Sequence, residues 1–326
     1  AGVFHTLDEE EKRFRGELIR QEISPIVFHH YRKFLGRDPS RAEYDRWTRE
    51  TDFASALDLA RLKETLSGRD LSGNPVVTEY TQERQATEAS IQAIKQKVEA
   101  ELLRYLSLPD EEKITFAQSL GLYPPSVIPA EAGIQDHGSP INTFGDDMLV
   151  PLSISEAQSI LTWLNSRSLH FGQSAFIALE ALLNQGLSPE GTRPNRVDLA
   201  TRLILIDILT GIITPFDDGE LMLSLYAMKK AAASYGVSTD GLHTTFDHLA
   251  AYYGASCPSA TNPSADAQCP RIIGHINGDH YVIVEDVFTE IDLKTGKSIR
   301  KIRYLDPGAG PEGNNQVMVI TEDEFL

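Results

Sequence analysis

The chain has 326 residues, of which 41% are hydrophobic and 24% charged, a composition typical of a folded protein with an ample core. Its 47 acidic residues outnumber its 30 lysines and arginines, and the net charge is −17. Nucleic-acid-binding proteins cluster lysine and arginine against the phosphates, so we expect no nucleic-acid partner. A chain of this length predicts two domains.

The most apolar run reads LILIDILTGII, at 203–213. A helix that crosses a membrane needs about 20 apolar residues. This run is much shorter and contains Asp207. It predicts a buried helix that stops at Gly211, and we expect no membrane span in this fragment.

Residues 1–118 predict an all-helical first domain. Pro25 suits the first turn of a helix, because the amide that proline lacks has no intrahelical acceptor there. Asp38 is predicted to cap the next helix, with Pro39 in its first turn. A longer helix at 79–107 carries apolar residues at helical spacing on one face, namely Ile91, Ile94, Val98, Leu102 and Leu106.

Residues 119–150 are rich in proline and glycine and predict a linker or a long surface loop. The segment 151–326 begins with helical patterns, at 154–165, 174–185, 197–211, 221–235 and 241–253. It continues with strand patterns, at 271–276, 280–288, 298–306 and 316–320. The sequence KTGK at 294–297 is typical of a hairpin turn. Helices followed by an antiparallel sheet predict an α+β domain.

Cys257 and Cys269 lie in one polar segment, SCPSATNPSADAQCP. A disulfide between them would close a short surface loop, contribute roughly 2–3 kcal/mol, and indicate an oxidising compartment. The alternative is two unpaired thiols of a cytosolic protein. The two cysteines with His275 and His280 also raise the question of zinc, but the spacing lacks a C-x-x-C pair, and we expect no metal or cofactor.

Three polar residues of the second half stand where chemistry could occur. Ser174 opens an apolar helix, where it is either an N-cap or the occupant of a nucleophile position. His280 begins an apolar strand, and Asp306 ends the strand after it; the alternatives are an ordinary edge histidine and an ordinary turn residue. A cysteine peptidase needs a nucleophile at a helix N-terminus, an imidazole within reach, and a third group that orients the ring.

The hairpin formed by the strands at 280–288 and 298–306 can bring His280 and Asp306 together. If the two residues stood opposite each other, the centre of pairing would be residue 293. The KTGK turn is centred between residues 295 and 296. We therefore predict a β-bulge that absorbs the difference.

Four motifs in order resemble the bacteriocin-processing, double-glycine leader peptidases, a papain-like family of cysteine peptidases. The first, SAFIALEALLNQG, keeps Ala178, Leu179 and Gly186 of the family's Cys-Gly-Pro-x-Ala-Leu-x-x-x-Leu-x-x-x-Gly. The others are SLYAMKKAAASYGV, IGHINGDHYVIVED and LDPGAG. The resemblance covers residues 154–326 and implies a papain-like domain at 151–326. It implies His280 as general base, Asp306 as its orienter, and Gln173 or Asn165 as the oxyanion amide.

The chain departs from the family at the nucleophile, because the family's cysteine falls on Ser174 and its glycine on Ala175. A serine hydroxyl has a pKa far above the range in which one imidazole could ionise it. We therefore expect little or no thiol-type peptidase activity from this chain. Either a cysteine was replaced, or the domain is naturally degenerate.

The expected partner is an extended peptide, ending in Gly-Gly as in the family or belonging to the same polypeptide. The alternatives are a module that binds peptides without cutting them and a surface scaffold. The scaffold alternative rests on YRKFLGRDPSRAEYDRW at 31–47, which resembles a short helical domain of secreted and surface bacterial proteins. We expect an extracytoplasmic location, with the cytoplasm as the alternative, and we expect the chain to be part of a longer polypeptide.

Overall fold

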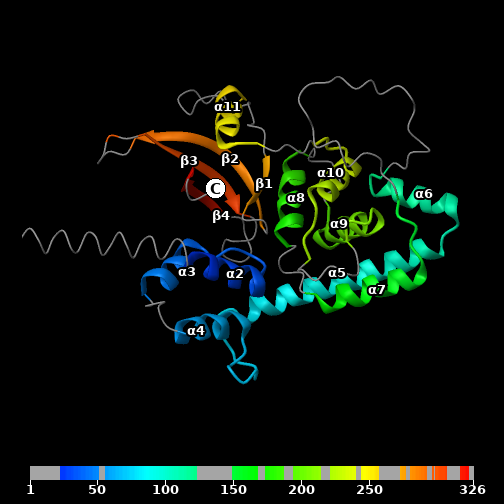
Figure 1. Ribbon diagram of the computed structural model, residues 1–326, viewed down its shortest axis with the longest axis horizontal. Helices are drawn as coiled ribbons and strands as arrows, with labels where there is room; N and C mark the ends of the chain where they lie inside the picture. The colour runs from blue at the N-terminus through cyan, green and yellow to red at the C-terminus, as the bar shows by residue number, and fades with distance from the viewer. Residues whose placement is uncertain are drawn as a thin grey trace, which may run out of the picture. The chain divides into compact units, whose positions relative to one another are not determined.

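The protein is described from a computed structural model. The described residues are 23–50, 56–122, 149–167, 173–186, 194–213, 221–239, 244–256, 272–276, 280–291, 296, 298–306 and 316–322. These ranges hold ten α-helices, one π-helical segment and one four-stranded antiparallel sheet, which confirms the predicted α+β class (Figure 1). Among them, no helix combines the length and the apolar character that a membrane crossing requires.

The chain forms two compact units, one made of 1–89 with 308–316 and the other of 90–307 with 317–326. The first division falls at residue 89 within α5 (Thr81–Ser107), whereas the sequence predicted a boundary near residue 118. The apolar face predicted for this helix is real: Ile91, Ile94, Val98 and Leu102 are buried in the core of the second unit. Leu120 and Leu122 are buried in the same core, so the packed chain extends into the predicted linker. The rest of that linker, 123–148, lies outside the described residues.

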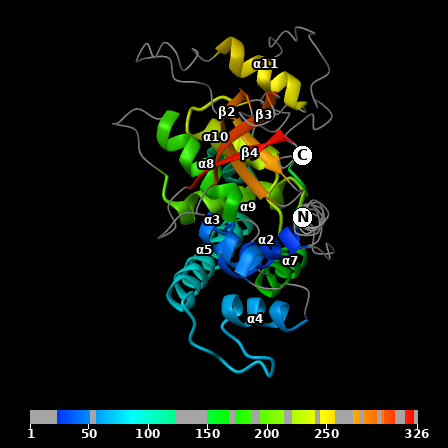
Figure 2. The ribbon, with the colours of Figure 1, turned by 90° about the vertical axis from the view of Figure 1, so that its left-hand side faces the viewer.

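The first unit contains α2 (Ser24–Leu35), α3 (Arg41–Asp45), the π-helical segment η2 (Arg46–Glu50) and α4 (Ala56–Ser67). Helix α4 lies beside α2 (Figure 2). Pro25 occupies the first turn of α2, as predicted, and Gly36 ends the helix with φ 69°, a conformation that glycine adopts without strain. The unit has its own apolar cluster, composed of Val27, Tyr31, Leu35, Trp47, Leu62, Leu66 and Tyr80.

The cap predicted for α3 was wrong. Ser40 is the N-cap, and it forms a reciprocal capping box with Glu43. The carboxylate of Asp38 is instead bound by the guanidinium of Arg32, with Nε to Oδ1 at 2.5 Å. A buried arginine that satisfies an aspartate removes that carboxylate from the competition for helix amides.

A buried arginine also joins three parts of the first unit. Arg37 donates to both carboxylate oxygens of Glu43, each at 2.9 Å, and its Nε donates to Glu83 at 2.6 Å. Tyr31 and Tyr80 share a hydrogen bond of 2.9 Å between their hydroxyls. The first unit therefore combines an apolar cluster with buried ion pairs.

Most helices of the second unit pack around one large apolar core. These helices are the later part of α5, α6 (Asp110–Ser119), α7 (Ile154–Ser166), α8 (Gln173–Gly186), α9 (Arg196–Leu209) and α10 (Leu225–Ser234). The unit also contains α11 (Phe246–Ser256), which packs in a separate, smaller cluster. Residues 203–209 of the predicted apolar run form the buried end of α9, and Gly211 follows that helix with φ 75°, as predicted. Helix α8 packs against α9 and α10 on one side and the sheet on the other.

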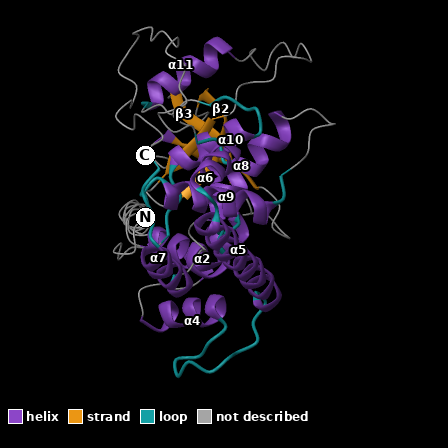
Figure 3. Ribbon diagram, turned by 90° about the vertical axis from the view of Figure 1, so that its right-hand side faces the viewer, coloured by secondary structure: helices purple, strands orange, loops and turns teal. Residues whose placement is uncertain are grey.

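The sheet runs in the order β1 (Ile272–Ile276), β2 (His280–Ile291), β3 (Ser298–Asp306) and β4 (Gln316–Thr321). It lies between α11 and the helices α8 and α10 (Figure 3). One face sends Tyr281 and Ile283 into the helical core. The other face packs against α11 through a smaller cluster composed of Phe246, Tyr253, Val282, Val284, Val287, Ile302 and Tyr304.

Candidate active site

Ser174 lies in the first turn of α8, one residue after the helix begins at Gln173. It is therefore not the residue before the helix, which is the capping position. Its hydroxyl oxygen accepts a hydrogen bond from the backbone amide of Tyr281, at 3.2 Å. Tyr281 directly follows His280, so α8 places Ser174 beside the start of β2. The amide ends of the helix favour negative charge at this position.

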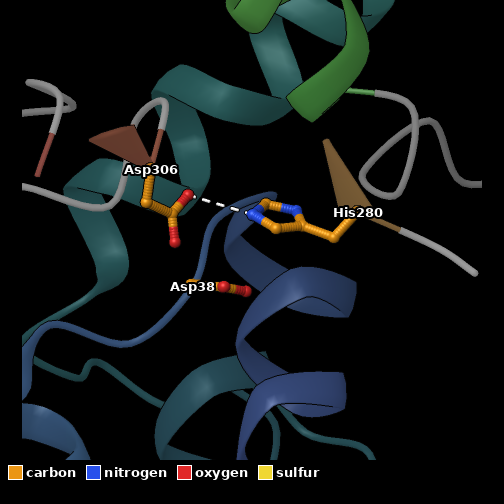
Figure 4. A group of neighbouring side chains, drawn as sticks. All are labelled: Asp38, His280 and Asp306. Carbon is orange, nitrogen blue, oxygen red and sulfur yellow. Dashed lines mark hydrogen bonds and ion pairs between the residues drawn. The ribbon is translucent and has the colours of Figure 1, made fainter. Parts of the chain in front are cut away.

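His280 and Asp306 form the second contact of the site. The ring nitrogen Nε2 of His280 lies 3.0 Å from Oδ1 of Asp306 (Figure 4). A carboxylate accepts, so this geometry places the proton on Nε2 and makes Nδ1 the basic nitrogen of the neutral ring. The arrangement is the one by which a carboxylate orients a catalytic imidazole.

The register of β2 and β3 explains how the two residues meet. Ile283 pairs with Leu305 and Val284 with Tyr304, and the register shifts between Val284 and Asp286. The predicted bulge is therefore present. Continued to the end of β3, this register sets Asp306 opposite the residue two positions after His280. The assumption that His280 and Asp306 stand directly opposite was wrong: they are diagonal neighbours, which still interact when the side chain is long.

Tyr281 is the site residue that sequence reasoning missed. Its backbone links Ser174 to β2, while its side chain points into the helical core. There the hydroxyl donates to the carbonyl of Leu223 at 2.7 Å. Burial, followed by the nearby charge of Asp207, raises the pKa of Tyr281 to about 12. The alternation of the strand indicated a buried tyrosine, but no sequence pattern indicates the acceptor of a backbone amide.

The three side chains are almost completely enclosed. Ser174 and His280 are each 2% exposed, and Asp306 is 1% exposed. Burial lowers the local dielectric and strengthens the hydrogen bonds within the site. It also means that a molecule from solvent reaches Ser174 only after covering groups move.

The other residues that the sequence singled out lie at several different places in the second unit. Gln173 is the first residue of α8, but its side chain lies outside the described residues. Asn165 is exposed in α7, and its backbone carbonyl accepts from Nζ of Lys95 at 3.2 Å. His275 is exposed on β1 and its ring stacks on Tyr281, with ring centroids 4.5 Å apart. Cys257 and Cys269 lie outside the described residues, so the predicted disulfide stays a prediction.

Comparisons with protein families, with curated proteins and with solved structures found no match to this chain.

Proposed function

We propose that the second unit is a papain-like domain of the cysteine-peptidase type, in which Ser174 occupies the position of the nucleophile. One observation carries this proposal. Helix α8 brings Ser174 to the backbone beside His280, and Asp306 engages the Nε2 side of that imidazole. The proposal is supported by these two contacts, which link a helix N-terminus to the strand of an imidazole and that imidazole to a carboxylate.

With a thiol at position 174, the residues have defined roles. His280 accepts the thiol proton at Nδ1, while Asp306 steadies the resulting imidazolium. The sulfur attacks the carbonyl carbon of the peptide, and the carbonyl oxygen becomes an anion that the amides at the start of α8 stabilise. Collapse expels the amine, which takes the proton from His280. Water, activated by the same imidazole, then hydrolyses the thioester and regenerates the thiol.

The serine of this chain performs that sequence poorly, because a hydroxyl is a far weaker acid than a thiol. We infer that the chain as it stands cuts peptides slowly or not at all. The substrate class is an extended peptide, and the resemblance to leader peptidases favours one that ends in Gly-Gly.

The test restores the thiol. Ser174→Cys is mixed with a peptide in which Gly-Gly precedes a cargo segment, and products are identified by mass spectrometry. A matched control, Ser159→Cys, places a thiol on the exposed face of α7. We expect cleavage by Ser174→Cys, none by the control, and loss of cleavage when His280→Ala is added.

A second candidate is a module that binds peptides without cutting them. The serine at position 174 and the enclosure of the three side chains favour it. In that case Ser174→Cys binds the Gly-Gly peptide and releases no product. If Ser174→Cys neither cleaves nor binds any extended peptide, both candidates are wrong.

A further inference from the structure

A chain of hydrogen bonds connects the site to Asp207, a carboxyl group in the core of the second unit. Asp207 lies in α9 and has no exposed surface. Its carboxylate accepts from the backbone amide of Ser224 at 3.0 Å and from the Ser224 hydroxyl at 2.5 Å. Enclosing a carboxyl group in an apolar helix costs free energy that an apolar residue would not cost. A packing role alone does not account for this residue.

Ser224 connects α9 to α10 through hydrogen bonds. Besides binding Asp207, its hydroxyl accepts from the amide of Ala227 at 2.9 Å and so caps α10. One serine is thereby fixed from two sides, and the backbone before it is fixed as well. That backbone includes the carbonyl of Leu223.

Tyr281 connects the backbone before α10 to β2. Its hydroxyl donates to the carbonyl of Leu223 at 2.7 Å, and its backbone amide donates to Ser174 at 3.2 Å. The side chain of Tyr281 is 4% exposed, so the ring has little room to adopt another position. The two hydrogen bonds of this one residue join the helical core to the atom in the nucleophile position.

We propose that Asp207 is a positioning residue, which acts through Ser224 and Tyr281 to hold the Tyr281 amide against the side-chain atom of residue 174. This inference rests on the proposed function, since it assigns the amide a role toward the nucleophile. An amide that donates to a sulfur atom stabilises the thiolate over the thiol. Breaking one of these hydrogen bonds should therefore make a thiol at position 174 less reactive near neutral pH.

The experiment measures thiol reactivity and does not depend on cleavage. The full chain with Ser174→Cys is treated with iodoacetamide from about pH 5 to pH 9. The modified peptide that contains residue 174 is quantified by mass spectrometry, which separates it from Cys257 and Cys269. The pH dependence of the rate gives the apparent pKa of the thiol.

Three variants of the Ser174→Cys chain each alter one hydrogen-bonding group in the series from Asp207 to residue 174. They are Asp207→Asn, Ser224→Ala and Tyr281→Phe. Each is expected to slow alkylation at pH 7 by roughly threefold to tenfold, since a shift of one pKa unit changes the thiolate fraction about tenfold. Ser224→Thr keeps the hydroxyl and is expected to restore the parent rate. Thr201→Val is the matched control, because Thr201 is also buried in α9 and its hydroxyl has no hydrogen-bond partner among the described residues.

Unchanged rates in folded Ser224→Ala and Tyr281→Phe overturn the positioning role, and so does an equal slowing by Thr201→Val. If Asp207→Asn does not fold, the comparison of Ser224→Ala with Ser224→Thr decides the question. A peptidase that cleaves but shows no network effect refutes the positioning role alone. If the three variants slow alkylation but the chain neither cleaves nor binds the peptide, the proposed function is wrong and the link between Asp207 and residue 174 stands.

Discussion

Glu43 in the first unit and Asp207 in the second are both carboxyl groups enclosed by protein, yet their pKa values move in opposite directions. For Glu43, burial alone would raise the pKa, but the hydrogen bonds and charge of Arg37 hold it below its usual range. For Asp207, burial raises the pKa to about 6, and the hydrogen bonds from Ser224 offset only part of that rise. The two pKa values shift in opposite directions because Glu43 is paired with the cation Arg37, whereas the hydrogen bonds named for Asp207 come from the uncharged Ser224.

The two units depend on their polar residues in different ways. In the first unit the carboxylates are partners of an arginine that ties separate segments together, so they contribute to stability as charged groups. In the second unit the buried carboxylate of Asp207 destabilises the fold at neutral pH. Its hydrogen bonds hold Ser224 in place. The chain has two tryptophans, Trp47 in the first unit and Trp163 in the second, so fluorescence can follow each unit separately.

The largest expected effect comes from removing the cation of the first unit. Arg37→Met leaves Glu43 and Glu83 without their partner, and we expect the unfolding free energy to fall by roughly 3–5 kcal/mol. Denaturation by urea, followed through Trp47 in a Trp163→Phe background, measures the loss. Arg41→Met is the control, because Arg41 forms an exposed ion pair with Asp45 and should change stability by less than about 0.5 kcal/mol. Equal losses in the two variants would contradict the role assigned to Arg37.

The next effect tests the close packing of the second unit. Gly121 has φ +90°, and a Cβ atom placed there would lie 2.3 Å from the carbonyl oxygen of Lys230. We expect Gly121→Ala to destabilise the unit by roughly 2–4 kcal/mol. Gly236→Ala has a similar φ of +80° with nothing within 4 Å, so it isolates the backbone strain and should cost about half as much or less. Urea denaturation followed through Trp163 compares them, and a smaller loss for Gly121→Ala than for Gly236→Ala would contradict the contact.

The smallest effect is a difference in pH dependence. The raised pKa of Asp207 means that the folded chain holds this proton more tightly than the unfolded chain does. Its contribution to stability is full below pH 3.8 and is lost as pH rises through about 6, which amounts to roughly 2–3 kcal/mol. Glu43 behaves in the opposite way: its contribution is full above pH 4.5 and is lost on acidification.

Urea denaturation at several pH values between about pH 4 and pH 7 tests this difference, with Trp163 as the probe of the second unit and Trp47 as the probe of the first. Between about pH 4 and pH 7 the second unit of the parent should lose roughly 2–3 kcal/mol of stability relative to that of the Asp207→Asn variant, while the first unit responds to pH alike in both chains. An identical slope in the variant and the parent would show that Asp207 is not the group that titrates.

Much of the fold could be predicted because local patterns determine it. The strand 298–306 was predicted to the residue, since alternation and a turn sequence define both ends. The helix predicted from residue 221 begins at Leu225, because Ser224 caps it. The cap of α3 was misassigned for a tertiary reason, since the partner that takes Asp38 from the helix is Arg32. Where a side chain had several possible partners, pattern alone could not choose among them.

The candidate site was predictable in its members and less so in its geometry. The motifs indicated Ser174, His280 and Asp306, and the turn position indicated a bulge. The diagonal placement of the pair follows from the register of two strands, which packing against α11 helps to set. The roles of Tyr281 and Asp207 depend on hydrogen bonds between residues far apart in the chain, and no local pattern encodes these. The papain-like fold and the catalytic roles stay predictions.

The bulge between Val284 and Asp286 changes the register between the two halves of the hairpin. The half that carries His280 and Asp306 packs on both faces. Beyond the bulge, Val287 and Ile302 still pack in the smaller cluster, but the strand ends at Ile291, which is 61% exposed. Residues inserted after Ile291 should therefore leave the pairing of Ile283 with Leu305 and of Val284 with Tyr304 unchanged. A short epitope or a fluorescent label inserted after Ile291 should leave the contact between His280 and Asp306 intact.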